Sequence, residues 1–471
     1  MKLMEKCVAT TVTAMLRVML RVYFRNIELF HAERVPRDGP VLFASNHPAS
    51  VTDAFLIGTT VRRQVHFVAT VRMFRSRPLA VLLRQCGIIP INRLKDDPHA
   101  MRSVMETFEA CFQVMERGGA VGIFPEGITY DDSQLKVIKS GAARMALELE
   151  HRHEGRLGLK IVPVGLTYSA KDRYRSDVIV HFGEPVRVGE FLVGYETRRK
   201  EAINELTAAI ERGLQLLIVH LPRLEQARVV EGVKRLYLER LKLGNRIVVE
   251  PMTPRAEELL LTQAIADAVG WAERSVPDRL GALARRLRVY ERCRARLRLP
   301  CEMPGESEAA GSLLRRAAAW TLLGIVGSPF ALYGWAHRLL PAAMVRWVAT
   351  RMTQAGARKA QTPHASMLSG LVAFGCCYAI YVFIVWLWFG WRVAGWYGLT
   401  LPPVGLLAHH YAAGMRRFAD GLRTLIVFWR VPFSAGRLKR MHSGLQAEIE
   451  ALREEYRRSL PAGTVGQTRA P

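Results

Sequence analysis

Six short apolar runs between residues 41 and 182 constrain the fold of this chain more than any other feature. Within each run the apolar residues are continuous rather than alternating with polar ones, as in strands buried on both faces of a parallel sheet. Stretches with helical spacing separate them, including residues 100–117 and 141–151. The runs are VLFAS (41–45), QVHFVA (64–69), GIIPI (87–91), AVGIF (120–124), KIVPVGLT (160–167) and DVIVHF (177–182). The pattern predicts an α/β domain with a mainly parallel sheet and helices on its faces.

Two long uncharged apolar stretches, Ala317–Ala336 and Ala365–Trp391, lie in the C-terminal third of the chain. About 20 apolar residues in a helix suffice to cross a bilayer, so both are predicted transmembrane helices. A shorter stretch, Val393–Ala408, contains Pro402 and Pro403 and is either a third span or a re-entrant hairpin. The predicted membrane region, residues 313–417, therefore holds two or three spans.

The other segments complete a predicted division into five parts. Residues 1–24 mix apolar residues with four basic ones, which favours an amphipathic helix in the membrane interface over a soluble surface helix. Residues 25–190 form the predicted α/β domain. Residues 191–312 follow as a helical region, for which packing or a lid role is expected, and residues 418–471 as a polar helical tail with a disordered end.

The net charge of +25 requires an anionic partner or surface. Nucleic acid and anionic lipid both attract such a charge. The chain has no zinc-finger spacing and no aromatic RNA-binding motif, whereas arginines flank apolar stretches, as in residues 285–298. We therefore expect membrane lipid as the partner and no nucleic acid. The seven cysteines form no CxxC pair, which is typical of reduced cysteines facing the cytoplasm.

The segment SNHPASVTDAF, residues 45–55, directly follows the first apolar run and holds a candidate catalytic pair, His47 and Asp53. An imidazole removes a proton from an alcohol while a carboxylate fixes its tautomer, and such a general base accelerates a reaction about 10²- to 10⁴-fold. On one regular helix the two side chains would point about 240° apart. Because Pro48 pushes His47 into extended geometry, we predict His47 on a loop and a helix starting near Ser50. A chance His–Asp pair is the alternative.

Further candidate site residues follow two other apolar runs. Arg93 in GIIPINR presents a fixed cation suited to a phosphate, or else forms a surface ion pair. In FPEG, Glu126 can accept hydrogen bonds from a polyol, and Gly127 allows a ligand to approach the backbone. A simple turn is the alternative for FPEG. The VPVG segment, residues 162–165, is apolar and does not by itself indicate a function.

In this order, the His–Asp motif, GIIPINR, FPEG and VPVG resemble the PlsC-like glycerophospholipid acyltransferase family. The resemblance covers roughly residues 25–190, and KSGAA (139–143) and FGEP (182–185) agree with it. It implies direct transfer of an acyl group from acyl-CoA or acyl-carrier protein to an acceptor hydroxyl. No acyl-enzyme, metal or cofactor is expected.

The resemblance also implies roles for individual residues. His47 would be the general base and Asp53 its partner. Arg93 would bind the phosphate of the acceptor, and Glu126 with Gly127 would hold its glycerol moiety. Lys139 is a weaker candidate for phosphate contact, because a solvated lysine explains it equally well.

One departure from the family pattern bears on the acceptor. Five residues separate His47 from Asp53, where most of the family places four. The longer spacing resembles a subgroup of glycerol-3-phosphate and dihydroxyacetone-phosphate acyltransferases whose motif opens with NHP. Members of this subgroup also have a long helical region and C-terminal membrane segments. Glycerol 3-phosphate or dihydroxyacetone phosphate is therefore the expected acceptor, in phospholipid biosynthesis.

Three other functions compete with this interpretation. Acylation of 1-acylglycerol 3-phosphate is the alternative within the class, and an inactive membrane lipid-binding protein is the alternative outside it. A metal-dependent hydrolase is disfavoured because no further His, Asp or Glu lies at ligand spacing from His47 and Asp53. We expect a multi-pass membrane protein whose catalytic domain faces the cytoplasm, where the thioester donors are.

Overall fold

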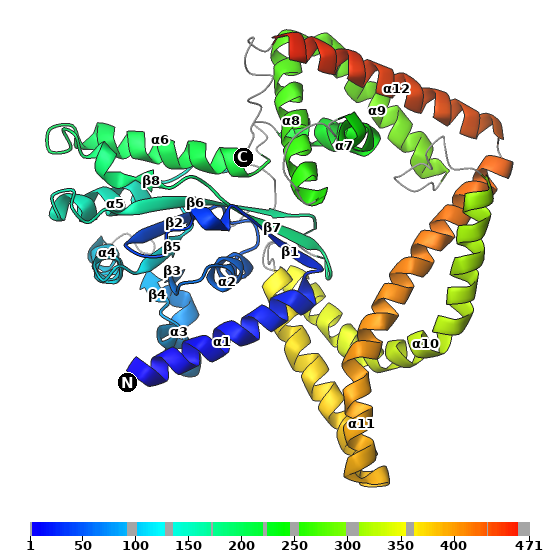
Figure 1. Ribbon diagram of the computed structural model, residues 1–471, viewed down its shortest axis with the longest axis horizontal. Coiled ribbons are helices and arrows are strands. Elements are labelled where there is room, and N and C mark those ends of the chain that lie inside the picture. The colour runs from blue at the N-terminus through cyan, green and yellow to red at the C-terminus, as the bar shows by residue number, and fades with distance from the viewer. Residues whose placement is uncertain are drawn as a thin grey trace. The chain divides into compact units, whose positions relative to one another are not determined.

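The computed structural model describes residues 2–91, 101–127, 135–170, 173–219, 224–244, 254–297, 310–354, 362–430 and 432–459. The chain divides into two compact units (Figure 1). The first comprises Met1–Leu221 with Ala349–Met367, and the second Pro222–Val348 with Leu368–Pro471. The sheet lies in the first unit, and most of the long helices lie in the second.

The sheet of the first unit has eight strands in the order β1-β7-β6-β2-β5-β3-β4, with β8 beside β6. The strands are β1 (Asn26–Phe30), β2 (Val41–Ser45), β3 (Val65–Thr70), β4 (Ile89–Ile91), β5 (Ala120–Ile123), β6 (Lys160–Tyr168), β7 (Asp177–Phe182) and β8 (Val186–Arg187). Strand β6 pairs antiparallel with β7 and β8, and the other described pairs are parallel. The predicted α/β fold with a mainly parallel sheet is confirmed.

All six apolar runs form strands, whereas β1 and β8 were not predicted. Strand β1 lies at the edge of the sheet and reads NIELF, so polar Asn26 and Glu28 interrupt its apolar residues. Strand β8 is only two residues long. Neither strand is buried on both faces, and both therefore lack the continuous apolar signature.

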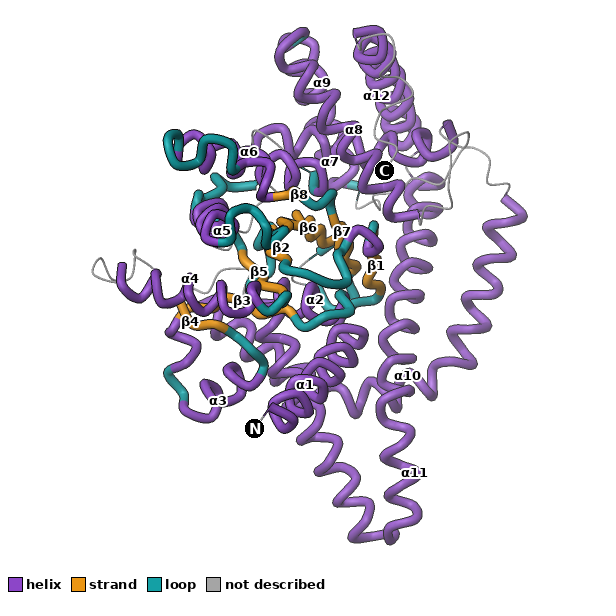
Figure 2. Tube along the Cα trace, turned by 60° about the vertical axis from the view of Figure 1, so that its left-hand side comes forward, coloured by secondary structure: helices purple, strands orange, loops and turns teal. Residues whose placement is uncertain are grey.

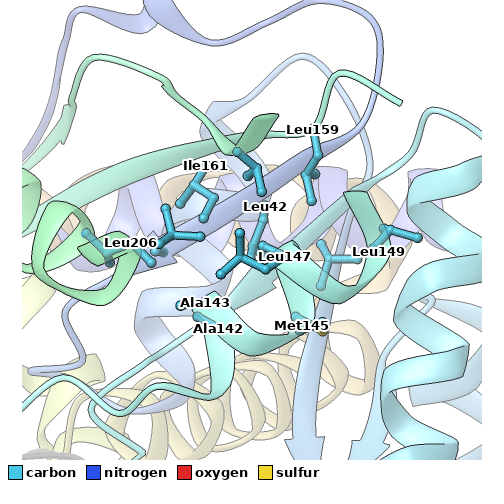
Figure 3. Close-up of a cluster of buried hydrophobic side chains, with 14 of the residues drawn as sticks. Leu42, Ala142, Ala143, Met145, Leu147, Leu149, Leu159, Ile161 and Leu206 are labelled. Carbon is cyan, nitrogen blue, oxygen red and sulfur yellow. The ribbon is translucent and has the colours of Figure 1, made fainter. Parts of the chain in front are cut away.

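Helices cover both faces of the sheet, as Figure 2 shows. They are α1 (Lys2–Tyr23), α2 (Val51–Thr60), α4 (Met101–Glu116), α5 (Gly141–Arg152) and α6 (Arg199–Leu217). Helix α3 (Arg77–Gln85) has no buried residue and contacts α1, and the 3-10 turns are η1 (Ala32–Arg34), η2 (Val71–Phe74) and η3 (Val188–Phe191). On β2, Leu42 and Ala44 join a core with α4, α5 and α6 (Figure 3), while Val41 and Phe43 join a second core with α1 and α2. Burial of a leucine, valine or phenylalanine side chain in these cores contributes about 1.5–3 kcal/mol to the free energy of unfolding.

Helix α6 belongs to the sheet unit, although the sequence placed a domain boundary at residue 190. Its predicted apolar face is buried, including Ile203, Leu206, Ile210 and Leu214. This face joins the core formed by α4, α5 and one face of the sheet. The unit therefore continues beyond the predicted boundary, because α6 covers part of the sheet.

In the second unit, α7 (Leu224–Gly244), α8 (Pro254–Ser275), α9 (Pro277–Arg296) and α12 (Pro432–Ser459) pack together. Arg279 of α9 donates to Glu455 of α12 at 2.6 Å, and the Tyr290 hydroxyl lies 3.1 Å from Nδ1 of His442. The buried residues of α12 have helical spacing: Leu438, Leu445, Ile449 and Leu452. The predicted helical region and the predicted polar tail thus share one helical cluster.

Among the described residues, one helical segment is long and apolar enough to cross a membrane, Ala365–Arg416 of α11 (Thr362–Arg430). The backbone leaves helical geometry at Gly390, with φ 77° and ψ 171°. A Cβ on Gly398 would lie 3.0 Å from Val382, and one on Gly405 would lie 3.1 Å from the Tyr378 hydroxyl. The two arms therefore run antiparallel as a helical hairpin.

The described residues contain one candidate membrane-spanning helical segment, where several transmembrane helices were predicted, and the number of membrane crossings remains a prediction. The stretches at 365–391 and 393–408 belong to one helical segment that turns back at Gly390. The third stretch, 317–336, lies in α10 (Ala310–Gln354), whose described residues do not form a further candidate span. The apolar stretches of the sequence lie where the hairpin lies, but they were predicted as separate elements rather than as the two arms of one hairpin.

Polar side chains join α10 to this hairpin within the second unit. Nδ1 of His337 donates to the Tyr333 carbonyl oxygen at 2.8 Å, and Nε2 then accepts from the Tyr397 hydroxyl at 2.7 Å. Arg338 donates to the Gly405 carbonyl oxygen at 2.8 Å. These bonds satisfy groups that would be costly to leave unpaired in apolar surroundings.

His181 on β7 gives the sheet unit an expected sensitivity to acid. Burial lowers the pKa of His181 to about 4, with further lowering from the nearby charges of His31 and Arg34. Because an unfolded histidine binds its proton near pH 6.5, stability is lost as the pH falls from about 6.5 towards 4, by about 2 kcal/mol at pH 5. The Tm in detergent should therefore fall more between pH 7 and pH 5 in the wild type than in His181→Phe. Equal decreases in both proteins would contradict this assignment.

Candidate active site

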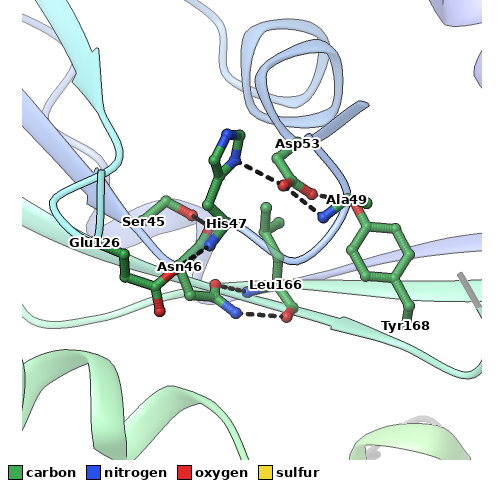
Figure 4. A network of polar contacts seen from close by, with 8 residues as sticks. All are labelled: Ser45, Asn46, His47, Ala49, Asp53, Glu126, Leu166 and Tyr168. Carbon is green, nitrogen blue, oxygen red and sulfur yellow. Dashed lines mark hydrogen bonds and ion pairs between the residues drawn. The ribbon is translucent and has the colours of Figure 1, made fainter. Parts of the chain in front are cut away.

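The candidate site lies where the carboxyl ends of β2 and β5 meet. These strands are parallel neighbours, with Val41 opposite Ala120 and Ala44 opposite Ile123. His47 follows β2, and Glu126 follows β5. Parallel strands place the residues after their carboxyl ends at the same edge of the sheet, so residues far apart in sequence meet here (Figure 4).

His47 and Asp53 form a hydrogen-bonded pair, with Nδ1 of His47 2.9 Å from Oδ2 of Asp53. The His47 side chain is 14% exposed and that of Asp53 is 0% exposed. Helix α2 begins at Val51, so Asp53 lies in its first turn and His47 on the preceding loop. The geometry predicted from Pro48 is confirmed. The loop has a positive φ of 56° at Ser50, with ψ at −133°.

Asp53 accepts two further hydrogen bonds. The Ala49 backbone N–H donates to Oδ2 at 2.8 Å, and the Tyr168 hydroxyl donates to Oδ1 at 2.5 Å. Burial and the neighbouring Asp53 charge raise the pKa of Tyr168 well above its usual value near 10. Tyr168 therefore stays protonated and donates. The sequence did not single out Tyr168, because its contact with Asp53 depends on the pairing of β6 with β2.

Tyr168→Phe should lower kcat by about tenfold with little change in KM, because Asp53 loses the donor that fixes its orientation towards His47. Steady-state kinetics of the full-length protein measure both constants. Tyr174→Phe is a matched control, since Tyr174 is exposed and lies outside the site. A pure rise in KM in Tyr168→Phe would contradict a positioning role for Tyr168.

Glu126 is 3% exposed and binds backbone groups on two loops. Its Oε2 accepts from the His47 N–H at 3.1 Å, and its Oε1 accepts from the Lys136 N–H at 3.3 Å. Glu126 thereby fixes the loop that carries His47. Its predicted contact with the glycerol moiety remains a prediction.

Two neighbours hold His47 and its strand in place. The Phe124 ring stacks on the imidazole, with centroids 3.9 Å apart and planes 18° apart. The side-chain amide of Asn46 donates to the Leu166 carbonyl oxygen at 3.0 Å and accepts from the Leu166 N–H at 2.7 Å. Asn46 thus extends the pairing of β2 with β6 to the residue directly before His47. No role was predicted from the sequence for Phe124 or Asn46.

The structure brings two of the predicted substrate-binding residues together. A Cβ on Gly127, whose φ is +70°, would lie 2.7 Å from Nζ of Lys139. Lys139 is exposed, so its ammonium lies at the surface beside FPEG. Arg93 lies outside the described residues. Substrate contacts of Gly127, Lys139 and Arg93 remain predictions.

Residues 26–167 match the protein family described as Acyltransferase. Glycerol-3-phosphate O-acyltransferase 1 of Saccharomyces cerevisiae is 34% identical over 149 residues, which cover 30% of this chain and 19% of the yeast protein. A chloroplastic 1-acyl-sn-glycerol-3-phosphate acyltransferase of Arabidopsis thaliana is 26% identical over 31% of this chain and 38% of the plant protein. The crystal structure of PlsC, the 1-acyl-sn-glycerophosphate acyltransferase of Thermotoga maritima, aligns with 44% of this chain and 80% of its own at 18% identity, with a TM-score of 0.33.

The resemblance to PlsC-like acyltransferases is confirmed for the segment that holds His47, Asp53, Glu126 and Gly127. The chain therefore contains an acyltransferase domain of this type. It matches only 19% and 18% of the length of the two yeast glycerol-3-phosphate acyltransferases.

Proposed function

We propose that this chain is a membrane-associated O-acyltransferase that transfers a fatty acyl group from a thioester donor to the hydroxyl of glycerol 3-phosphate or dihydroxyacetone phosphate. The His47–Asp53 pair carries the proposal. It lies at a strand end within the matched acyltransferase segment, and its 2.9 Å hydrogen bond has the geometry of a base and its orienting carboxylate.

The geometry supports direct transfer. Nδ1–H of His47 donates to Asp53, which leaves Nε2 as the basic nitrogen of the neutral ring. Nε2 takes the proton from the acceptor hydroxyl as its oxygen attacks the thioester carbonyl carbon. The tetrahedral intermediate then collapses, the carbon–sulfur bond breaks, and the imidazolium returns the proton to the departing thiolate. Asp53 stabilises the imidazolium between these two transfers.

The acceptor assignment depends on two lines of support. The five residues between His47 and Asp53 match the subgroup spacing, and two of the similar yeast proteins are glycerol-3-phosphate O-acyltransferases by name. Cations suited to the phosphate are Arg93 and Lys139, the latter beside Gly127. Acylation of 1-acylglycerol 3-phosphate is the second candidate, since similar plant and bacterial proteins carry that name.

An acceptor panel separates these functions. The purified full-length protein in lipid vesicles receives acyl-CoA or acyl-carrier protein with glycerol 3-phosphate, dihydroxyacetone phosphate or 1-acylglycerol 3-phosphate. We expect the highest kcat/KM with one of the first two acceptors, without any added cofactor or metal. A preference for the third acceptor would favour the second candidate. Absence of turnover with every pair would favour the lipid-binding alternative.

We further propose that the hairpin Ala365–Arg416 anchors the protein in a membrane and crosses it more than once, with the sheet unit on the cytoplasmic face. Exposed apolar side chains on both arms support this, including Leu387, Trp388 and Trp396. Each arm has about 25 residues and is long enough to cross a hydrocarbon core of about 30 Å. Protease protection of tags in the hairpin and in the sheet unit, in sealed vesicles, tests the topology.

A further inference from the structure

The segment formed by η2 and α3, residues 71–85, is amphipathic and uncovered. It holds four arginines and no acidic residue. No residue of α3 is buried, and Leu79 and Leu82 are 41% and 40% exposed. At 100° per residue these two leucines share one side of the helix, whereas Arg77 and Arg84 lie on the other side. A surface helix of a soluble domain normally buries its apolar side.

Helix α1 adds a second uncovered apolar stripe beside this segment. Met15, Val18 and Val22 are 48%, 63% and 50% exposed and share one side of α1. Another side of α1, with Leu20 and Tyr23, is buried against the sheet. Helices α1 and α3 contact each other, and both views show them together below the sheet (Figures 1 and 2). We call the stripe of α1 together with residues 71–85 the α1–α3 face.

The α1–α3 face begins at the edge of the sheet that carries the candidate site. Strand β3 is parallel to β5, and β5 is parallel to β2, so their carboxyl ends lie at one edge. Residue Thr70 ends β3 and η2 follows directly, just as His47 follows β2. An acyl chain held at this edge would have an apolar surface close by.

We propose that the α1–α3 face docks on the surface of a bilayer that contains anionic lipid. Leucines and valines enter the headgroup boundary, and the arginines bind lipid phosphates. Charge complementarity indicates an anionic bilayer as the partner, since the charged residues within 71–85 are all basic. Only residues 1–24 were predicted from the sequence to lie at a membrane interface, so α3 is a new contact. Docking does not depend on the proposed reaction.

Modification of an introduced cysteine tests the docking. Leu82→Cys and the control Val193→Cys, whose valine is 81% exposed and outside this face, are made in the full-length protein. A membrane-impermeant maleimide is applied in detergent, in phosphatidylcholine vesicles and in vesicles that also contain phosphatidylglycerol. Mass spectrometry of the peptide that carries each introduced cysteine gives its rate of modification, whatever the native cysteines do. The rates of modification of the two variants do not depend on catalysis.

We expect the rate of modification in Leu82→Cys to be at least about tenfold lower in phosphatidylglycerol vesicles than in phosphatidylcholine vesicles, because each arginine near an anionic surface contributes about 1 kcal/mol to docking. The rate in Val193→Cys should stay unchanged. Replacing Arg75, Arg77 and Arg84 with Gln should abolish the difference between the two kinds of vesicle. An unchanged rate in Leu82→Cys would overturn the proposal. So would equal rates of modification in both kinds of vesicle.

Discussion

His47→Ala is expected to lower kcat by about 10²- to 10⁴-fold while the protein stays folded and bound to membranes. The side chain supplies the only proposed base, and its Nε2 is the nitrogen that faces away from Asp53. The imidazole is 14% exposed and packs on Phe124 rather than in either core, so its removal costs little stability. Turnover with saturating donor and acceptor, together with the Tm, measures both effects.

His151→Ala is a suitable control for this variant. His151 belongs to the same unit, its side chain is 41% exposed, and it lies at the end of α5 away from the strand ends that form the site. This control should retain wild-type turnover. If His47→Ala retained it too, the general-base mechanism would be wrong even if the protein proved to be an acyltransferase.

Asp53→Asn is expected to lower kcat by a similar factor and, unlike His47→Ala, also to destabilise the fold. The Asp53 carboxylate accepts from three donors: His47, Ala49 and Tyr168. An amide has one acceptor oxygen, so its NH2 group would face donors and favour the wrong tautomer of His47. Because Asp53 is fully buried, the mismatch should cost about 1–3 kcal/mol.

Parallel measurements of kcat and Tm separate the two variants. Asp38→Asn is the control, since Asp38 is exposed and lies outside the site. Loss of activity with an unchanged Tm in Asp53→Asn would mean that the carboxylate orients the imidazole without supporting the loop. Wild-type activity would exclude Asp53 as the partner of His47.

Local rules account for what the sequence predicted well. Continuous apolar runs located the five interior strands and the edge strand β4, because interior strands covered on both faces have few polar positions. The His47–Asp53 geometry followed from the backbone restriction that Pro48 imposes on its predecessor. Both inferences need only the residue and its immediate neighbours.

Contacts between distant segments account for what was not predicted. Tyr168 reaches Asp53 only because β6 pairs with β2, and Glu126 reaches His47 only because β5 pairs with β2. The packing of α12 on α9 and the turn at Gly390 likewise depend on partners that apolar spacing does not identify. Arg93 lies outside the described residues, so its prediction is untested.

The pairing of β1 with β7 has a consequence for synthesis on the ribosome. Asn26 pairs with Asp177, so β1 cannot pair until the chain has been translated as far as β7. During that time β1 is an unpaired strand, and such strands favour aggregation or chaperone binding. The partner strand is nevertheless complete long before the hairpin at Ala365 begins. The sheet can therefore form in the nascent chain before any part of the hairpin reaches a membrane.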